Sequence, residues 1–241
     1  DGMMYKIEGE DLYLIGTSEH SMIGRFIDQI LPAESLPQTY LLLPLFRKEK
    51  GAPRHRGAVA STASTSLKKQ EMIVVTESPQ ESKDWYEKLW RMSVELFRSL
   101  DIPVRQLECC SGDLADLKVK SCDIEAWFRQ QKFFEVCSCS NLGDAQARRL
   151  RIRYKDENGK MQLCHTLNNT CVAPPGSLIA FLENNLQADG TVRIPQVLRP
   201  YMGGKELLVP AEKSQFVIFV LFIQIVEPFP AVGAARSPVS G

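Results

Sequence analysis

The sequence lacks the glycine-rich loops with which the common nucleotide-binding folds hold phosphate, since neither GxxxxGK(S/T) nor GxGxxG occurs. A bound nucleotide would therefore have to be held by side chains. The sequence also lacks a CxxC pair, and its three histidines, at positions 20, 55 and 165, are widely separated. Structural zinc sites are built from closely spaced pairs of such ligands, so we do not expect one here.

Net charge is also absent, because 29 lysines and arginines balance 29 aspartates and glutamates. Proteins that grip nucleic acid through its phosphates are usually basic, so RNA binding would need a local patch or a further domain. The apolar run at 216–226 has only eleven residues, whereas a membrane-spanning helix needs about 20. The N-terminal residues have neither the basic stretch nor the apolar run of a targeting peptide. We therefore expect no membrane association.

The seven cysteines lie mostly in apolar segments. An odd number of cysteines in such segments is typical of buried, reduced thiols and of a reducing compartment. We expect a cytoplasmic protein, with a mitochondrial or plastid location as the alternative.

Hydrophobic periodicity predicts a sheet with helices packed on it. A capping box from Ser78 to Glu81 opens a long amphipathic helix, and Asn158-Gly159 predicts the turn of a hairpin. Closely spaced strands after Pro103 favour antiparallel pairing, so the expected fold class is α+β. We expect strands at 11–16, 40–49, 69–76, 103–110, 122–128 and 132–140, a hairpin across 150–167, and helices at 20–30, 78–100 and 176–186. The helical residues expected to face the core are Trp85, Leu89, Met92, Leu96 and Leu100.

Three of the expected strands carry polar side chains for which an ordinary core strand has no use. Strands that deliver such groups to one place indicate an enzyme cleft. Glu135 and Ser138 are three residues apart, so a bulge or bend would be needed to bring both to one ion. The polar residues are Asp123, Glu125, Glu135, Ser138, Asn168, Asn169 and Thr170.

Separated blocks of sequence occur in the order found in one family. They are TSE at 17–19, FRKE at 46–49, DIEAW at 123–127, EVCSCSN at 135–141, HTLNNT at 165–170 and YMGG at 201–204. From about residue 10 to residue 206 the chain resembles the catalytic domain of class II seryl-tRNA synthetases. The resemblance implies a class II aminoacyl-tRNA synthetase-like antiparallel β-sheet flanked by helices. It also implies a serine–tRNA ligase, which makes seryl-adenylate from serine and ATP and passes the seryl group to tRNA(Ser).

The resemblance assigns roles to residues. Arg47 would be the catalytic residue, holding the α-phosphate and stabilising the charge that develops there. The implied serine site comprises Thr17, Ser18, Glu19, Arg47, Glu71, Asn168 and Thr170. The implied ATP site comprises Arg47, Lys48, Glu49, Glu135, Val136, Cys137 and Ser138, with Mg2+ on Glu135 and Ser138.

Other interpretations follow from the residues alone. FRKE also fits a solvated strand edge, and Thr17-Ser18 also fits a helix N-cap. We interpret Asp123 and Glu125 as structural support rather than as catalytic groups. The arginines at 148, 149, 151 and 153 fit an RNA-binding patch, but a solvated strand face with ion pairs is the preferred interpretation.

The sequence departs from the family at four places. Gly176 stands where class II synthetases carry an arginine that stacks on adenine and reaches the γ-phosphate. Residues 58–69 lack the aromatic residue expected to pack against adenine, and Leu67 is the nearest candidate. The N-terminal tRNA-binding arm and motif 1 of the dimer interface have no counterpart, so we expect weak tRNA binding. Residues 1–206 form the synthetase-like domain in this interpretation, and 207–241 form an unmatched tail.

These departures leave two alternatives to an active ligase. One is a catalytically impaired, synthetase-like protein that serves as a binding or regulatory partner. The other is a truncated and frame-shifted gene model. For the full-length family we expect a homodimer.

Overall fold

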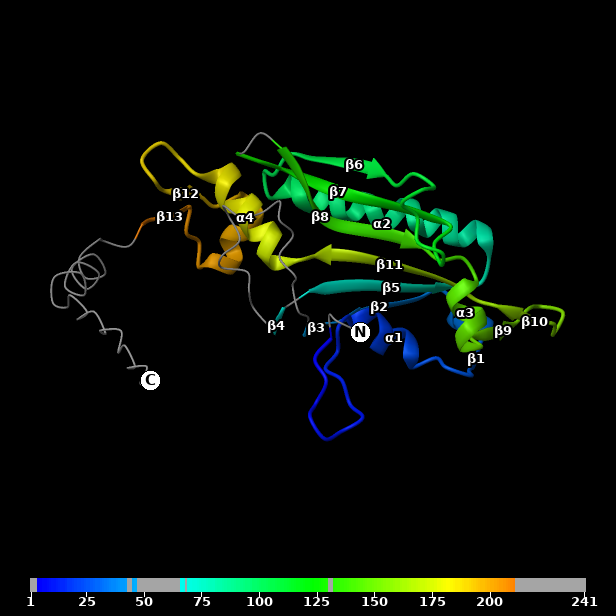
Figure 1. The fold of residues 1–241 in the computed structure, drawn as a ribbon. Helices are drawn as coiled ribbons and strands as arrows, with labels where there is room; N and C mark the ends of the chain where they lie inside the picture. The colour runs from blue at the N-terminus through cyan, green and yellow to red at the C-terminus, as the bar shows by residue number, and fades with distance from the viewer. Residues whose placement is uncertain (1–3, 43–44, 47–65, 68, 130–131, 211–241) are drawn as a thin grey trace, which may run out of the picture.

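A six-stranded antiparallel sheet forms the centre of the computed structural model, which describes residues 4–42, 45–46, 66–67, 69–129 and 132–210 (Figure 1). Every neighbouring pair of strands in this sheet runs antiparallel. The expected fold class, an antiparallel sheet flanked by helices, is therefore confirmed. In spatial order the strands are β2 (Gln38–Leu42), β5 (Gln70–Thr76), β11 (His165–Val172), β8 (Lys132–Asn141), β7 (Lys120–Phe128) and β6 (Val104–Glu108).

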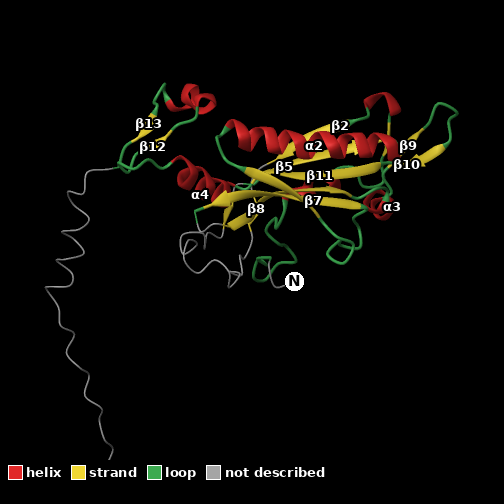
Figure 2. Ribbon diagram, turned by 90° about the horizontal axis from the view of Figure 1, so that it is seen from above, coloured by secondary structure: helices red, strands yellow, loops and turns green. Residues whose placement is uncertain are grey.

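Helices cover both faces of the sheet (Figures 1 and 2). On one face lies α2 (Pro79–Ser99), whose Leu89 packs with Val74 and Leu167. On the other face lie α1 (Ser18–Gly24) and α3 (Ala145–Leu150), which pack with Ile73 and Val75. Alternate residues of β5 thus enter different core clusters, as the two-residue period of a strand requires. A further helix, α4 (Pro174–Asn185), packs beyond the end of α2.

The remaining elements are short. The hairpin predicted around Asn158-Gly159 is confirmed, with Gly159 at a φ of 73° in the turn. Its strands, β9 (Arg153–Lys155) and β10 (Met161–Leu163), continue a small sheet that begins with β1 (Ile30–Leu31). The other short elements are β3 (Leu45–Phe46), β4 (Ser66–Leu67), β12 (Val192–Arg193), β13 (Leu207–Leu208), and the 3-10 helices η1 (Ala33–Ser35) and η3 (Gln196–Met202).

The start of α2 is stabilised as the capping box predicts. The Ser78 hydroxyl accepts a hydrogen bond from the backbone N–H of Glu81 at 3.1 Å. The Glu81 carboxylate in turn accepts from the N–H of Glu77 at 3.0 Å, one residue earlier than the ideal pattern. The buried stripe of α2 is rotated from the expected one, since Met92 is 44% exposed. Its buried residues are Ser82, Tyr86, Leu89, Ser93 and Phe97.

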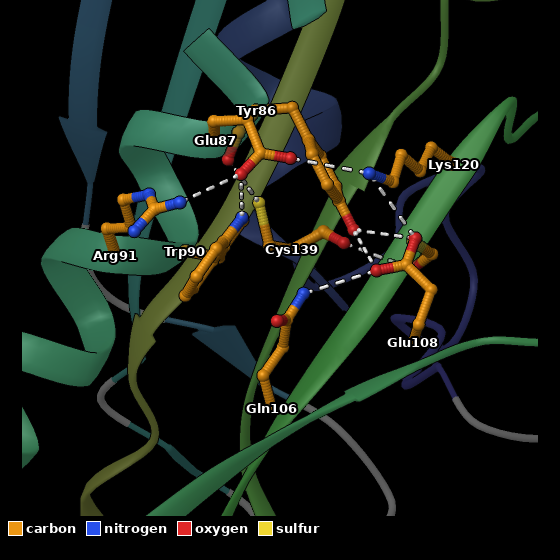
Figure 3. A network of polar contacts seen from close by, with 9 residues as sticks. Tyr86, Glu87, Trp90, Arg91, Gln106, Glu108, Lys120 and Cys139 are labelled. Atoms are coloured by element: carbon orange, nitrogen blue, oxygen red, sulfur yellow. Dashed lines mark hydrogen bonds and ion pairs between the residues drawn. The ribbon is translucent and has the colours of Figure 1, made fainter. Parts of the chain in front are cut away.

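A polar network joins α2 to β6 and β7, at one edge of the sheet (Figure 3). The Tyr86 hydroxyl donates to Glu108 of β6 at 3.5 Å, and the Lys120 ammonium of β7 lies between Glu87 and Glu108. Burial raises the pKa of the Tyr86 phenol, which keeps the hydroxyl protonated as a donor. The network therefore fixes α2 against β6 and β7, on the face opposite Asp123, Glu125 and Thr170.

Three expected elements differ from the structure. Residues 11–16 form no strand, because their only ladder contact is an isolated bridge between Lys6 and Tyr13. The apolar side chains there stay exposed, so the alternation had no sheet to face. The helix expected at 20–30 is shorter than predicted, because α1 gives way to turns after Gly24. The strand expected at 40–49 appears as β2 and β3, and residues 47–49 lie outside the described part of the chain.

The arginines at 148–153 are not on one strand face. Arg148 and Arg149 belong to α3, Arg151 adopts a left-handed conformation after it, and only Arg153 lies on a strand. Alanine, glutamine, arginine and leucine are all good helix formers, which explains why this segment became a helix. The expected ion pairs are present, from Arg148 to Asp144 and from Arg151 to Asp28.

Candidate active site

The candidate site lies on the sheet face opposite α2. Strand β11 shows which side chains belong to it, because Asn169 points to α2 and hydrogen-bonds Ser93 at 3.1 Å. Its neighbours Asn168 and Thr170 must then point to the opposite face. Two of the three polar residues at the end of β11 thus reach the site, whereas Asn169 is part of the core beneath α2.

Glu71 and Thr170 form the first part of the site. They are register partners on β5 and β11, and the Thr170 hydroxyl donates to Oε1 of Glu71 at 3.3 Å. The Lys69 ammonium lies 2.6 Å from the same oxygen. The other carboxylate oxygen, Oε2, is buried and has no hydrogen-bond partner among the described residues. A buried acceptor without a partner is costly unless a ligand supplies a donor.

A bulge in β8 forms the second part of the site. Ile124 faces Cys137 across the β7–β8 ladder, but the next residue, Glu125, faces Glu135, so Val136 is the extra residue. The bulge places Glu135 on the same face as Ser138, which pairs with Asp123. This is the geometry required for Glu135 and Ser138 to share one ion.

Val136 and Cys137 lie differently from the other residues assigned to the ATP site. Their side chains are 3% and 1% exposed and pack in a core cluster with Phe97 and Ala180. Only their backbone groups could contact a nucleotide on the site face.

Three carboxylates gather on this face, and their environment raises two pKa values. The pKa of Glu135 is raised by burial and by Asp123, against the opposing charges of Lys69 and Lys118. The pKa of Asp123 is raised by burial and by Glu125, against Lys118. Glu125 itself is paired with Arg105 at 2.6 Å. The described residues contain no group of three or more His, Cys, Asp or Glu that could hold a metal ion alone. A cation here would need oxygens from a ligand as well.

Replacing Glu135 by glutamine is expected to stabilise the protein at neutral pH. A carboxyl whose pKa is raised on folding contributes full stability below its ordinary value of 4.5, and this contribution is lost as the pH rises through the raised pKa. At pH 7 the buried charge therefore opposes folding. We expect Glu135→Gln to raise the melting temperature by about 1–3 °C at pH 7, with no gain near pH 4. Exposed Glu157→Gln is the control, and an equal gain at both pH values would contradict the assignment.

The T-S-E segment approaches β11 at a different point. Thr17 occupies the N-cap position of α1 but makes no side-chain cap bond, and Ser18 is fully buried with its hydroxyl unpartnered among the described residues. The Glu19 carboxylate accepts a hydrogen bond from the Gln146 amide at 3.2 Å, and Gln146 accepts from Thr166 at 2.7 Å.

The hydrogen bonds from Glu19 through Gln146 to Thr166 place Glu19 far from the Glu71–Thr170 pair. Thr166 and Thr170 are four residues apart on β11, or about 13 Å at strand spacing. The structure therefore joins Glu71 with Thr170 but brings Glu19 to Thr166, through Gln146.

Three of the residues that the resemblance assigns to the site are not among the described residues. Arg47, Lys48 and Glu49 lie outside the described residues, as does the segment 58–65.

Gly176, where an arginine is expected, is described in the first turn of α4. A Cβ atom added to it would meet only the Val136 Cγ1 atom, at 4.0 Å. The backbone there thus has room for a side chain.

Lys69 and Gln146 were not singled out as site residues from the sequence. Lys69 could have been found from its place two residues before Glu71, since residues i and i+2 share a strand face. Gln146 gave no comparable signal, because its role depends on the unexpected helix α3.

Comparisons with known proteins place the chain among aminoacyl-tRNA synthetases. The profile of the family described as "tRNA synthetase class II core domain (G, H, P, S and T)" matches residues 4–185. The chain is 44% identical over 218 residues to the serine–tRNA ligase of Thermococcus sibiricus, covering 89% of this chain and 47% of that protein. It thus spans about half the length of the curated relatives it matches.

Solved structures show the same likeness. The ATP complex of Pyrococcus horikoshii seryl-tRNA synthetase superposes with a TM-score of 0.78 at 44% identity, over 87% of this chain and 47% of that one. The AMP complex of the cytoplasmic serine–tRNA ligase of Naegleria fowleri gives 0.72 at 32% identity, over 85% and 49%.

Proposed function

The chain belongs to the family of class II tRNA synthetase core domains, and from this premise we propose that it is the catalytic part of a serine–tRNA ligase. The observation that carries the proposal is the Glu71–Thr170 pair, with a buried carboxylate oxygen that has no partner among the described residues, on the same sheet face as Glu135 and Ser138. A small amino acid at the first pair and a nucleotide at the second would lie side by side across β11.

The proposed serine pocket uses two polar groups of the substrate, its ammonium and its hydroxyl. Oε2 of Glu71 would accept from the serine ammonium, and Thr170 would contact the serine hydroxyl. Asn168 lines the same face, and Glu19 would reach the ammonium if the T-S-E segment closed over it. Alanine keeps the ammonium but lacks the hydroxyl, so it would lose the contact with the buried Thr170 side chain, which disfavours its binding.

The donor set of the second part fits a nucleotide with its magnesium ion. Mg2+ prefers a few carboxylate and hydroxyl oxygens together with phosphate oxygens, and Glu135 with Ser138, which lie on one face of the sheet, would supply the protein's share. Bound Mg2+ would neutralise negative charge on the phosphates. Arg47, Lys48 and Glu49 would complete the ATP site. Arg47 would stabilise the α-phosphate while the serine carboxylate displaces pyrophosphate to give seryl-adenylate.

A calorimetric titration of the purified chain with serine and with alanine tests the pocket. The proposal requires saturable binding of serine and at least about tenfold weaker binding of alanine, as expected when buried polar groups lose their partner. Equal affinities for both, or no serine binding, would contradict it.

One observation favours a second candidate function. Gly176 leaves the adenine side of the nucleotide site without the expected arginine, so the chain could bind serine as a regulatory partner without activating it. Serine binding without any serine-dependent reaction of ATP would identify this case.

Further features bear on assembly and location. The apolar side chains Ile7, Leu12, Tyr13 and Ile15 are each more than 40% exposed, which fits a surface that a second copy covers in the homodimer proposed for the full-length family. None of the helices within the described ranges is long and apolar enough to cross a bilayer. All seven cysteines are free thiols, which supports the proposed cytoplasmic location.

Binding of tRNA(Ser) by this chain is expected to be weak, with a dissociation constant above about 1 μM at physiological salt, because non-specific phosphate contacts alone give values in that range. The net charge is zero, and Arg148 and Arg151 already pair with aspartates. Filter binding measures the affinity, with full-length Pyrococcus horikoshii synthetase as the positive control. Sub-micromolar affinity of the chain would overturn this expectation.

A further inference from the structure

The two oxygens of the Glu71 carboxylate lie in different environments. Oε1 takes the Lys69 ammonium at 2.6 Å and the Thr170 hydroxyl at 3.3 Å. Oε2 is buried and has no partner in the described part of the chain. The side chain of Glu71 is 3% exposed and that of Lys69 is 26% exposed. One oxygen is therefore engaged by the protein, while the other is left without a donor.

The burial of Glu71 explains why a fixed cation is needed beside it. An ionised carboxylate removed from water is strongly disfavoured unless an opposite charge lies close by. Within the described residues, Lys69 is the cation that forms an ion pair with Glu71. A substrate ammonium alone could not serve this purpose, because it is absent between reaction cycles.

Lys69 also lies near the second part of the site. Glu71 is on β5 and Glu135 is on β8, with β11 between them. The positive charge of Lys69 lowers the pKa of Glu135, against the burial and the Asp123 charge that raise it. The close contact of the ammonium is with Oε1 of Glu71, at 2.6 Å, which leaves Oε2 without a partner among the described residues.

We propose that Lys69 is a positioning residue for the amino-acid substrate: it holds Oε1 of Glu71, so that the carboxylate is fixed in direction and Oε2 is left available to the substrate ammonium. This role rests on the proposed serine-binding function. Lys69 acts through Glu71 and does not itself contact the serine.

Serine and ATP titrations of the full chain test this role. Lys69→Met is expected to weaken serine binding by about 10- to 100-fold, the range seen when a buried charge loses its partner. Lys69→Arg should bind serine within about threefold of the wild type, because a guanidinium can replace the ammonium. The ATP affinity should stay within about threefold in both variants. Exposed Lys83→Met on α2 is the matched control, and Lys69→Gln replaces Lys69→Met if that variant fails to fold.

A thermal double-mutant cycle tests the ion pair without substrate. Lys69→Met should lower the melting temperature in the wild-type background but have little effect beside Glu71→Gln, where no buried charge remains to be neutralised. Equal effects in the two backgrounds would show that Lys69 does not act through Glu71.

Four outcomes of the titrations overturn the proposal. Unchanged serine binding in Lys69→Met removes the positioning role, and tighter binding would mean that Lys69 occupies the ammonium site itself. Parallel loss of serine and ATP binding would indicate a purely structural role. If the wild-type chain binds no serine, the proposed function fails first, and this result appears before any variant is measured.

Discussion

Gly176→Arg is expected to raise the rate of serine-dependent ATP–pyrophosphate exchange by about 10- to 1000-fold. A guanidinium at the start of α4 would stack on adenine and contact a phosphate in a water-poor cleft, which together supply on the order of 2–4 kcal/mol. The backbone can accept the change. Gly176 has no left-handed φ, and a new Cβ would meet only Val136, at 4.0 Å.

The same substitution is expected to preserve folding. Glycine in a helix is about 1 kcal/mol less favourable than a good helix former, so arginine should leave the melting temperature unchanged or slightly higher. Gly176→Met is the matched control, because it adds a long side chain without the charge. Arg47→Ala on the Gly176→Arg background should abolish exchange again. If exchange does not increase while serine binding is normal, the segment 58–69 becomes the limiting defect and the regulatory alternative gains support.

Glu71→Gln is expected to weaken serine binding by about 100- to 1000-fold, because the ammonium loses its charged acceptor in a buried site. Glutamine has nearly the same shape and can still bond Thr170, so the loss should reflect charge rather than packing. Glu77→Gln, an exposed change just beyond β5, is the control. Calorimetry measures the affinity, and thermal unfolding checks that the variant is folded. A loss smaller than about threefold would mean that the ammonium binds elsewhere.

Local signals in the sequence predicted the parts of the fold that depend on neighbouring residues. The Ser78–Glu81 capping box and the Asn158-Gly159 turn each act within a few residues, and both are present in the structure. The alternation in 11–16 was misleading, because a strand also needs a partner and the segment has only the Lys6–Tyr13 bridge. The buried face of α2 also differs from the predicted one because of a contact between residues far apart in the sequence. Ser93 faces the core because it bonds Asn169, a contact 76 residues away in the chain.

In the candidate site too, some features could be predicted from the sequence, whereas others depend on pairing between strands. The sequence predicted which strands carry Glu71, Thr170, Glu135 and Ser138, since their order and polarity are visible in it. It showed that a bulge was needed between Glu135 and Ser138 but not that Val136 supplies it, because bulges are set by pairing between strands. The contact of Lys69 with Glu71 is local and follows from their spacing of two residues, whereas the contact of Gln146 with Glu19 depends on tertiary positions and had no local signal.

Serine-dependent ATP–pyrophosphate exchange by the purified chain is the most direct test of the proposal that this chain activates serine. We expect slow but measurable exchange that requires serine, is not supported by alanine, disappears in Glu71→Gln and rises in Gly176→Arg. Absence of serine-dependent exchange in both the wild type and Gly176→Arg, at serine concentrations that saturate binding, would contradict the proposal.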